Sequence, residues 1–156
     1  TDAAAFSLAQ PGGHWINLEL KPSPGTEELT GRLVAREVLR LSGEQPRHLP
    51  LLTSFRPAAL VGARSAGPGL PRGLLIDRLP DDRSDRDWLS LATDLGCCAV
   101  VLQHRLWQAE RVALAREAGL RCLSYTVNEA DEVQRLQDLG LDGLITDRVD
   151  LFDPGR

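Results

Sequence analysis

Short apolar runs of strand length recur along the chain and alternate with segments of helical periodicity. The runs cover residues 15–20, 51–55, 73–77, 99–103, 121–127 and 144–147. Between them, apolar residues recur three and four positions apart, as on one face of a helix. Strands joined through helices form right-handed crossovers on a parallel sheet. The alternation therefore predicts an α/β fold whose sheet is either doubly wound or closed as a barrel.

The expected helix ends support this reading. Three helices are expected to end at glycines, Gly96, Gly119 and Gly140, each suited to the left-handed residue that closes a helix. At the other ends, Ser84 with Asp87 predicts a capping box, and Asn128 is the expected N-cap of the helix that follows it. A complete barrel of eight units has about 250 residues. We therefore expect six of eight units in one incomplete domain spanning residues 1–156.

Charge and cysteine content exclude several classes of protein. The net charge is −4, from 18 basic and 22 acidic residues without long runs of one sign, so binding to nucleic acid or to an anionic membrane is not expected. No apolar stretch approaches the roughly 18 residues of a membrane span. Three cysteines are too few for a disulfide framework, which favours a reducing compartment, and the N-terminus does not resemble a signal peptide.

The first expected strand carries the most informative pattern. Apolar and polar residues alternate, with Ile16, Leu18 and Leu20 on one face and Asn17, Glu19 and Lys21 on the other. In an open antiparallel sheet this would be the ordinary alternation of core and solvent faces. In a parallel sheet covered by helices, the polar face points into the barrel or the sheet end, where an unpaired charge is costly. Glu19 and Lys21 therefore predict a polar site that contains a metal or a phosphate.

Lysine is otherwise absent from the chain, which has 17 Arg and Lys21 alone. Other strand ends are polar too, and all of them are expected on the rim where the active sites of α/β folds lie. They are Thr53, Ser54, Asp77, Gln103, His104, Thr126, Asn128, Thr146 and Asp147. The alternatives are that Asn128 and Asp147 only cap helices and that His104 is an ordinary surface residue.

Four motifs together resemble one family. They are INLELKP (16–22), LLTSF (51–55), LPRGLLID (70–77) and LSYTVNEADEVQRLQDLGLDGLITD (123–147). In this order and spacing they are similar to the glycerophosphodiester phosphodiesterase family, and most similar to its bacterial cytoplasmic branch. The resemblance extends from about Trp15 to Phe152.

This resemblance implies a TIM barrel, of which the six strands would be the third to the eighth. It also implies hydrolysis of glycerophosphodiesters to sn-glycerol 3-phosphate and an alcohol, in glycerophospholipid breakdown in the cytoplasm, with Mg²⁺ or Ca²⁺ as cofactor. By the same resemblance, Glu19 is a metal ligand and Lys21 faces the phosphate. Phe55 and Tyr125 are expected to bind substrate, with Tyr125 in place of the family's more frequent Trp as a wall on the glycerol side.

The chain departs from the family in its acid and base residues. The family's His-Arg-Gly, its E-x-D metal pair and the following His-Asp are all missing, and the sequence around His104, His-Arg-Leu, does not match the first of them. We therefore expect no catalytic acid or base in this chain and no activity from the 156 residues alone, whereas the complete protein would be an enzyme.

Two other readings stay open at this point. One is a noncatalytic barrel remnant that binds a phosphorylated ligand or a protein partner. The other is an unrelated phosphate-binding α/β enzyme, although the Gly/Pro-rich residues 67–73 lack the G-x-x-x-x-G-K pattern. An open sheet of six strands would expose two edges, so formation of a homo-oligomer is also expected.

Overall fold

The computed structural model describes residues 16–43, 49–79 and 85–148. Its six strands are β1 (Asn17–Glu19), β2 (Leu51–Ser54), β3 (Arg72–Ile76), β4 (Ala99–Gln103), β5 (Arg121–Tyr125) and β6 (Gly143–Leu144). Its helices are α2 (Glu27–Ser42), α3 (Pro57–Ala66), α4 (Asp85–Asp94), α5 (Ala109–Glu117), α6 (Ala130–Asp138) and the short 3₁₀ helix η1 (His104–Leu106). The expected capping residue Ser84 lies outside the described residues.

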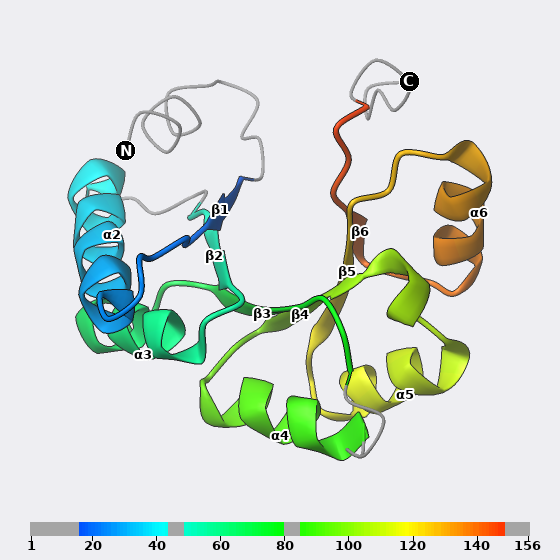
Figure 1. Cartoon of the computed structure of the whole chain (residues 1–156), viewed down its shortest axis with the longest axis horizontal. Helices are drawn as coiled ribbons and strands as arrows, with labels where there is room; N and C mark the ends of the chain where they lie inside the picture. The colour runs from blue at the N-terminus through cyan, green and yellow to red at the C-terminus, as the bar shows by residue number, and fades with distance from the viewer. Residues whose placement is uncertain (1–15, 44–48, 80–84, 149–156) are drawn as a thin grey trace.

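All six strands are parallel and follow one another in chain order, β1 to β6, across a single sheet. The sheet curls, and the helices that connect successive strands lie on its convex side (Figure 1). A doubly wound sheet would carry helices on both faces. Of the two arrangements that the sequence allowed, a doubly wound sheet and a barrel, the structure shows the second, as a half-barrel with TIM-barrel topology. No helix within the described residues is long and apolar enough to cross a membrane.

The two faces of the sheet have different neighbours. Leu52, Leu74 and Val100 point outward and are buried beneath the helices in the main apolar cluster. Thr53, Gly73 and Val101 lie on the concave face, since a Cβ placed on Gly73 would be 3.1 Å from Thr53 Cγ2 and 3.4 Å from Val101 Cγ2. The outward core thus leaves the concave face and its rim available for polar side chains.

The strands at both edges are shorter than the sequence predicts. β1 is confined to three residues and Lys21 follows it rather than ending it, while β6 has only two residues. The backbone pairing nevertheless continues past β6, because Ile145 N donates to Ser124 O and Val127 N donates to Ile145 O. The alternation around β1 is confirmed, with Leu20 buried and Glu19 and Lys21 exposed.

The predicted helix ends are confirmed at the C-termini but not at Asn128. Gly96, Gly119 and Gly140 have φ of 66°, 74° and 80°, the left-handed conformation expected of them. The N-cap of α6 is Glu129, without a side-chain hydrogen bond, so the prediction for Asn128 is wrong. Its Oδ1 instead accepts from Asp147 N at 3.0 Å and from the Thr146 hydroxyl at 3.1 Å. The side-chain oxygen of Asn128 is thus bonded to the loop after β6 and not to the N-terminus of α6.

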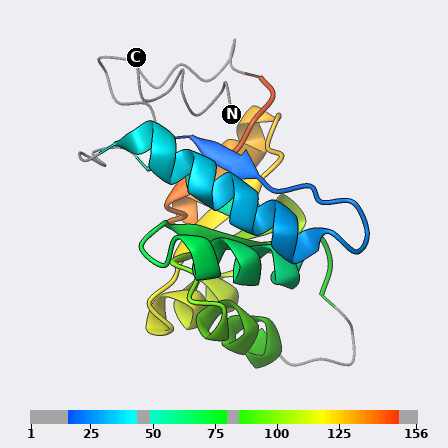
Figure 2. The same ribbon diagram turned by 90° about the vertical axis from the view of Figure 1, so that its left-hand side faces the viewer.

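Helices α2 and α3 pack with their backbones in contact through two glycines (Figure 2). A Cβ on Gly31 would overlap Ala59 O, and a Cβ on Gly62 would overlap Glu28 O. Neither glycine has a positive φ, so close approach and not backbone conformation requires them. The seam formed by Gly31 and Gly62 thus fixes α2 on α3.

We expect Gly31→Ala to destabilise the fold, because the added methyl must push two helix backbones apart. Overpacking of this kind costs about 1–3 kcal/mol, which lowers Tm by roughly 5 °C in a chain of this size. Thermal unfolding followed by circular dichroism measures the change. Gly69→Ala is the matched control, since a Cβ there meets nothing within 4 Å. Equal Tm values for the two variants would show that the seam is not tight.

Candidate functional site

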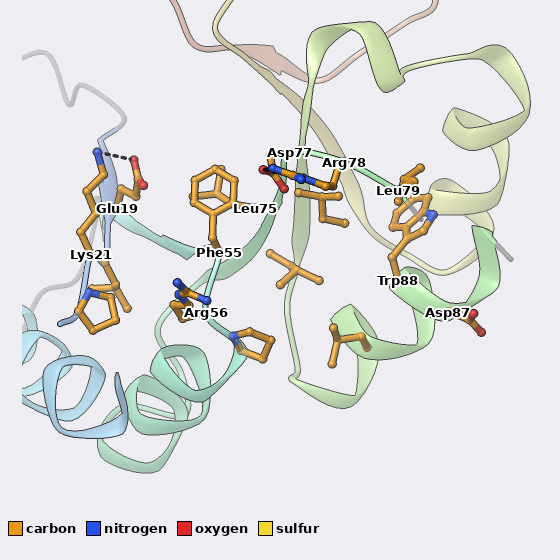
Figure 3. Close-up of a pocket in the computed structure, with 16 residues that line it drawn as sticks. Glu19, Lys21, Phe55, Arg56, Leu75, Asp77, Arg78, Leu79, Asp87 and Trp88 are labelled. Carbon is orange, nitrogen blue, oxygen red and sulfur yellow. Dashed lines mark hydrogen bonds and ion pairs between the residues drawn. The ribbon is translucent and has the colours of Figure 1, made fainter. Parts of the chain in front are cut away.

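A cavity of about 640 Å³ lies at the carboxyl ends of β1, β2 and β3 (Figure 3). Carboxyl ends of parallel strands are where the active sites of α/β barrels form. Its polar and aromatic lining residues are Glu19, Lys21, Phe55, Arg56, Asp77, Arg78, Asp87 and Trp88. Three consecutive strand ends therefore contribute charged groups to one hollow.

Glu19 and Lys21 form an ion pair at the end of β1, with 3.4 Å between Glu19 Oε2 and Lys21 Nζ. The residue between them is fixed to β2, because Leu20 N donates to Thr53 O at 2.7 Å and the Ser54 hydroxyl donates to Leu20 O at 2.8 Å. This clamp holds the two charged side chains on the same side of the strand. The Glu19 side chain is 30% exposed and that of Lys21 77% exposed. Both charges are thus solvated in this structure, so the cost of burying them does not by itself require a metal or phosphate.

Phe55 and Tyr125 meet across the concave face, although they come from the ends of β2 and β5. Their ring centroids are 5.6 Å apart, with planes at 80°. The Tyr125 hydroxyl donates to Ile76 O at 3.1 Å, which ties β5 to the end of β3. Phe55 lines the cavity, whereas Tyr125 is not among the lining residues and contacts Phe55. The four site residues predicted from sequence are therefore gathered on one rim.

The Tyr125 hydroxyl is strongly held in its protonated form. Partial burial, together with the negative charges of Asp77 and Glu19, raises its pKa to about 12. Both carboxylates are therefore within electrostatic reach of this phenol. At neutral pH the hydroxyl is a donor already committed to Ile76 O.

Two arginines of the cavity were not predicted from sequence. Arg56 and Arg78 follow the ends of β2 and β3, as Lys21 follows β1. Arg78 pairs with Asp77 at 3.4 Å in an exposed contact, which contributes little to stability. Lys21, Arg56 and Arg78 each stand two residues after the end of a strand. This repeated spacing could have identified the two arginines from sequence.

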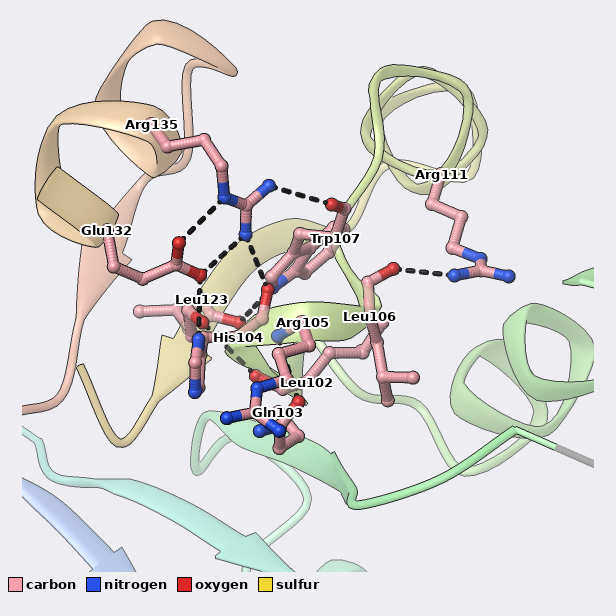
Figure 4. Close-up of polar contacts among 11 residues, drawn as sticks. Leu102, Gln103, His104, Arg105, Leu106, Trp107, Arg111, Leu123, Glu132 and Arg135 are labelled. Carbon is pink, nitrogen blue, oxygen red and sulfur yellow. Dashed lines mark hydrogen bonds and ion pairs between the residues drawn. The ribbon is translucent and has the colours of Figure 1, made fainter.

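A second polar cluster lies on the same rim, beyond β4. His104 contacts Glu132 of α6, and Arg135 binds that carboxylate (Figure 4). The sequence marked His104 only as a polar strand end. Its partners come from α6, beyond α5 and β5 in the chain, so that no local pattern joins the three residues.

Among the described residues, Glu19 is a rim carboxylate of the kind that a divalent ion binds. Within residues 16–43, 49–79 and 85–148, no group of three or more His, Cys, Asp or Glu side chains converges as a metal site. Glu19 offers carboxylate oxygens at a barrel rim, the type of donor that Mg²⁺ and Ca²⁺ prefer. The Glu19 carboxylate is therefore a suitable ligand for either ion, and a complete coordination shell would need further oxygen ligands.

The sequence matches the Glycerophosphoryl diester phosphodiesterase family over residues 3–151. The chain belongs to this family. No curated protein matches the chain significantly.

Solved structures agree with the family. A phosphodiesterase from Oleispira antarctica, solved with the product sn-glycerol-3-phosphate, is 30% identical, with a TM-score of 0.73 over 86% of this chain and 52% of its own. A protein from Silicibacter pomeroyi, assigned as a glycerophosphoryl diester phosphodiesterase, is 26% identical, with a TM-score of 0.78 over 94% of this chain and 51% of its own. The chain thus spans about half the length of these two structures.

The fold also occurs outside enzymes of this name. A glycerol uptake operon antiterminator regulatory protein from Listeria monocytogenes has a TM-score of 0.65 at 13% identity, over 94% of this chain and 74% of its own. At that identity the likeness concerns the fold alone.

Tyr125 is the single tyrosine of the chain, so its ionisation can be followed directly. We expect the absorbance change of phenolate near 295 nm to have its midpoint near pH 12, well above the usual value of about 10. Asp77→Asn should lower that midpoint, because it removes a negative charge that disfavours the phenolate. A wild-type midpoint near 10 would contradict the burial of the hydroxyl described above.

Proposed function

We propose that the full-length protein hydrolyses glycerophosphodiesters to sn-glycerol 3-phosphate and an alcohol in a metal-dependent reaction. Membership of the family, together with the Glu19 and Lys21 pair at the end of β1, supports this proposal. The reaction belongs to glycerophospholipid breakdown. We also propose that it takes place in the cytoplasm, which agrees with the three free cysteines.

In the proposed reaction, Lys21 binds a nonbridging oxygen of the phosphate. Its ammonium group is exposed at the rim and has three donors, so it can approach a phosphate without losing its contact with Glu19. Glu19 is proposed as one ligand of Mg²⁺ or Ca²⁺. When bound, such an ion neutralises charge on the phosphodiester and polarises its oxygens.

Phe55 and Tyr125 are proposed to contact the organic part of the substrate. Because the Tyr125 hydroxyl already donates to Ile76 O, its ring is the part that remains for substrate contact. The edge-to-face packing of the two rings fixes their orientation. They would form a rigid wall on the glycerol side of the phosphate.

We further propose that two preceding βα units complete the barrel. In the described part of the chain, β1 and β6 each pair with a neighbour on one side only, so two parallel edges remain. The general acid and base of the reaction would come from these units, and the described residues would supply the phosphate-binding half of the site. If the edges are not closed within one chain, pairing between copies would cover them.

Incubation of the full-length protein with glycerophosphocholine and with glycerophosphoethanolamine tests the activity. We expect Mg²⁺ or Ca²⁺ to support release of sn-glycerol 3-phosphate, detected by ³¹P NMR, and EDTA to abolish it. Binding of sn-glycerol 3-phosphate without any turnover would favour the noncatalytic alternative instead.

Glu19→Gln should weaken binding of the divalent ion strongly, because an amide replaces a charged oxygen donor without a change in size. Isothermal titration calorimetry with Mg²⁺ and with Ca²⁺ measures this independently of activity. Asp142→Asn is a matched control, since Asp142 pairs with Arg121 at the opposite end of the strands. Unchanged affinity in the Glu19 variant would remove it from the metal site.

Lys21→Arg should lose activity although the charge is kept. A chain that uses Arg at 17 positions and Lys at one is expected to need a compact ammonium there, since a planar guanidinium beside a metal would displace the metal or the phosphate. The measurement is kcat/KM for Lys21→Arg and Lys21→Ala on one diester at saturating metal. Near wild-type activity of the Arg variant would refute the need for an ammonium, and retention by the Ala variant would exclude Lys21 from the site.

A further inference from the structure

A histidine is held at the rim by a carboxylate from a neighbouring helix. His104 is the first residue of η1, directly after β4, and Glu132 lies in the first turn of α6. His104 Nδ1 is 2.6 Å from Glu132 Oε1, and the two side chains are 22% and 21% exposed. The imidazole is therefore mostly enclosed but still accessible from the rim.

Arg135 fixes the carboxylate from its other side. Its Nε donates to Glu132 Oε2 at 2.8 Å and its Nη2 donates to Oε1 at 2.7 Å. The same guanidinium donates to His104 O at 2.8 Å and to Trp107 O at 3.1 Å. Both residues of the pair are thus anchored, so the ring has little freedom to turn (Figure 4).

This arrangement decides which ring nitrogen carries the proton. Hydrogen bonds from Arg135, and less strongly from His104, lower the pKa of Glu132 to about 2 against the opposing effect of burial. An ionised carboxylate can only accept, so His104 Nδ1 must be the donor. In the neutral imidazole, Nε2 is then an acceptor with a fixed direction.

Nε2 lies on the side of the ring away from Glu132 (Figure 4), and no residue in the described ranges bonds to it. The strand pairing places the backbone of His104 one residue beyond the position that faces Tyr125. Gln103 pairs in register with Tyr125, and His104 is the next residue along the rim. The rim therefore carries an oriented acceptor that has no partner within the described residues, just after the strand next to the one that ends at Tyr125.

We propose that Nε2 of His104 accepts a hydrogen bond from a hydroxyl group of the substrate's glycerol moiety. The inference rests on the proposed function, in which the ring of Tyr125 lies on the glycerol side. A hydroxyl is a donor and suits an acceptor nitrogen, whereas the oxygens of an ionised phosphodiester are acceptors and have no proton to donate. His104 is thus a binding residue for the part that all glycerophosphodiesters share.

A purely structural role for the cluster makes a different prediction. If His104 only joined η1 to α6, its loss would reduce activity on every phosphodiester alike. A contact with glycerol hydroxyls affects only substrates that have them. Discrimination between two substrates therefore separates the two roles.

The experiment compares wild type, His104→Phe and the control Arg121→Gln in the full-length protein. The control breaks an exposed ion pair at the opposite ends of the strands. The substrates are glycerophosphoethanolamine and bis(4-nitrophenyl) phosphate, which has no glycerol. For His104→Phe we expect kcat/KM to fall about tenfold on the first, mainly through KM, as for the loss of one hydrogen bond, and to change less than twofold on the second. Equal losses on both substrates, or no loss, would overturn the proposal.

A second measurement does not depend on the variant being folded. In wild-type protein labelled with ¹⁵N-histidine, titration with sn-glycerol 3-phosphate should shift the Nε2 resonance of His104. Saturable binding without a shift of that resonance would overturn the contact and leave the proposed function intact. A wild type that neither binds this product nor hydrolyses the diester would overturn the proposed function, and the contact with it.

Discussion

The position of the candidate site depends on how the backbone of Leu20 is held by β2. Its N–H and its carbonyl both bond to that strand, through Thr53 O and the Ser54 hydroxyl. Because both polar groups of Leu20 are bonded to β2, the backbone that carries Glu19 and Lys21 is held in place at the rim. Although β1 has only three residues, its charged pair is therefore anchored to the sheet. The buried hydroxyl of Ser54 thereby helps to hold the end of β1 against β2.

Several arginines of this chain satisfy backbone carbonyls. Arg64, Arg111 and Arg116 donate to the carbonyls of Asp94, Leu106 and Gly140, all at or near helix ends. Buried Arg72 donates to four carbonyls, those of Gly67, Pro68, Leu70 and Gly96. The last carbonyls of a helix lack partners within it, and a planar group with five donors can reach several at once. At these positions a lysine could not make the same set of contacts.

The parallel alternation of strands and helices and three C-terminal helix ends were predictable from sequence, because they depend on local periodicity and on glycine. The pairing of Glu19 with Lys21 was predictable for the same reason, since residues two apart in a strand share a face. The use of Asn128 was not, because its donors come from a loop 18 residues further along the chain. The cluster of His104, Glu132 and Arg135 was missed for a similar reason, as 28 residues separate the imidazole from its carboxylate. The exposure of the charged pair depends on which elements lie beside β1, and in the described residues β1 pairs with β2 alone.

The glycine seam between α2 and α3 has a mechanical consequence for the rim. At Gly31 and Gly62 the two helix backbones are in direct contact, with no side chain between them. Relative movement of the two helices is therefore restricted. Since α2 follows β1 and α3 follows β2, we expect the two βα units to move as one rigid body. Thermal displacement of Glu19 and Lys21 would then be correlated with that of Phe55, and the spacing between the charged groups and the aromatic wall would persist even while the rim as a whole moves.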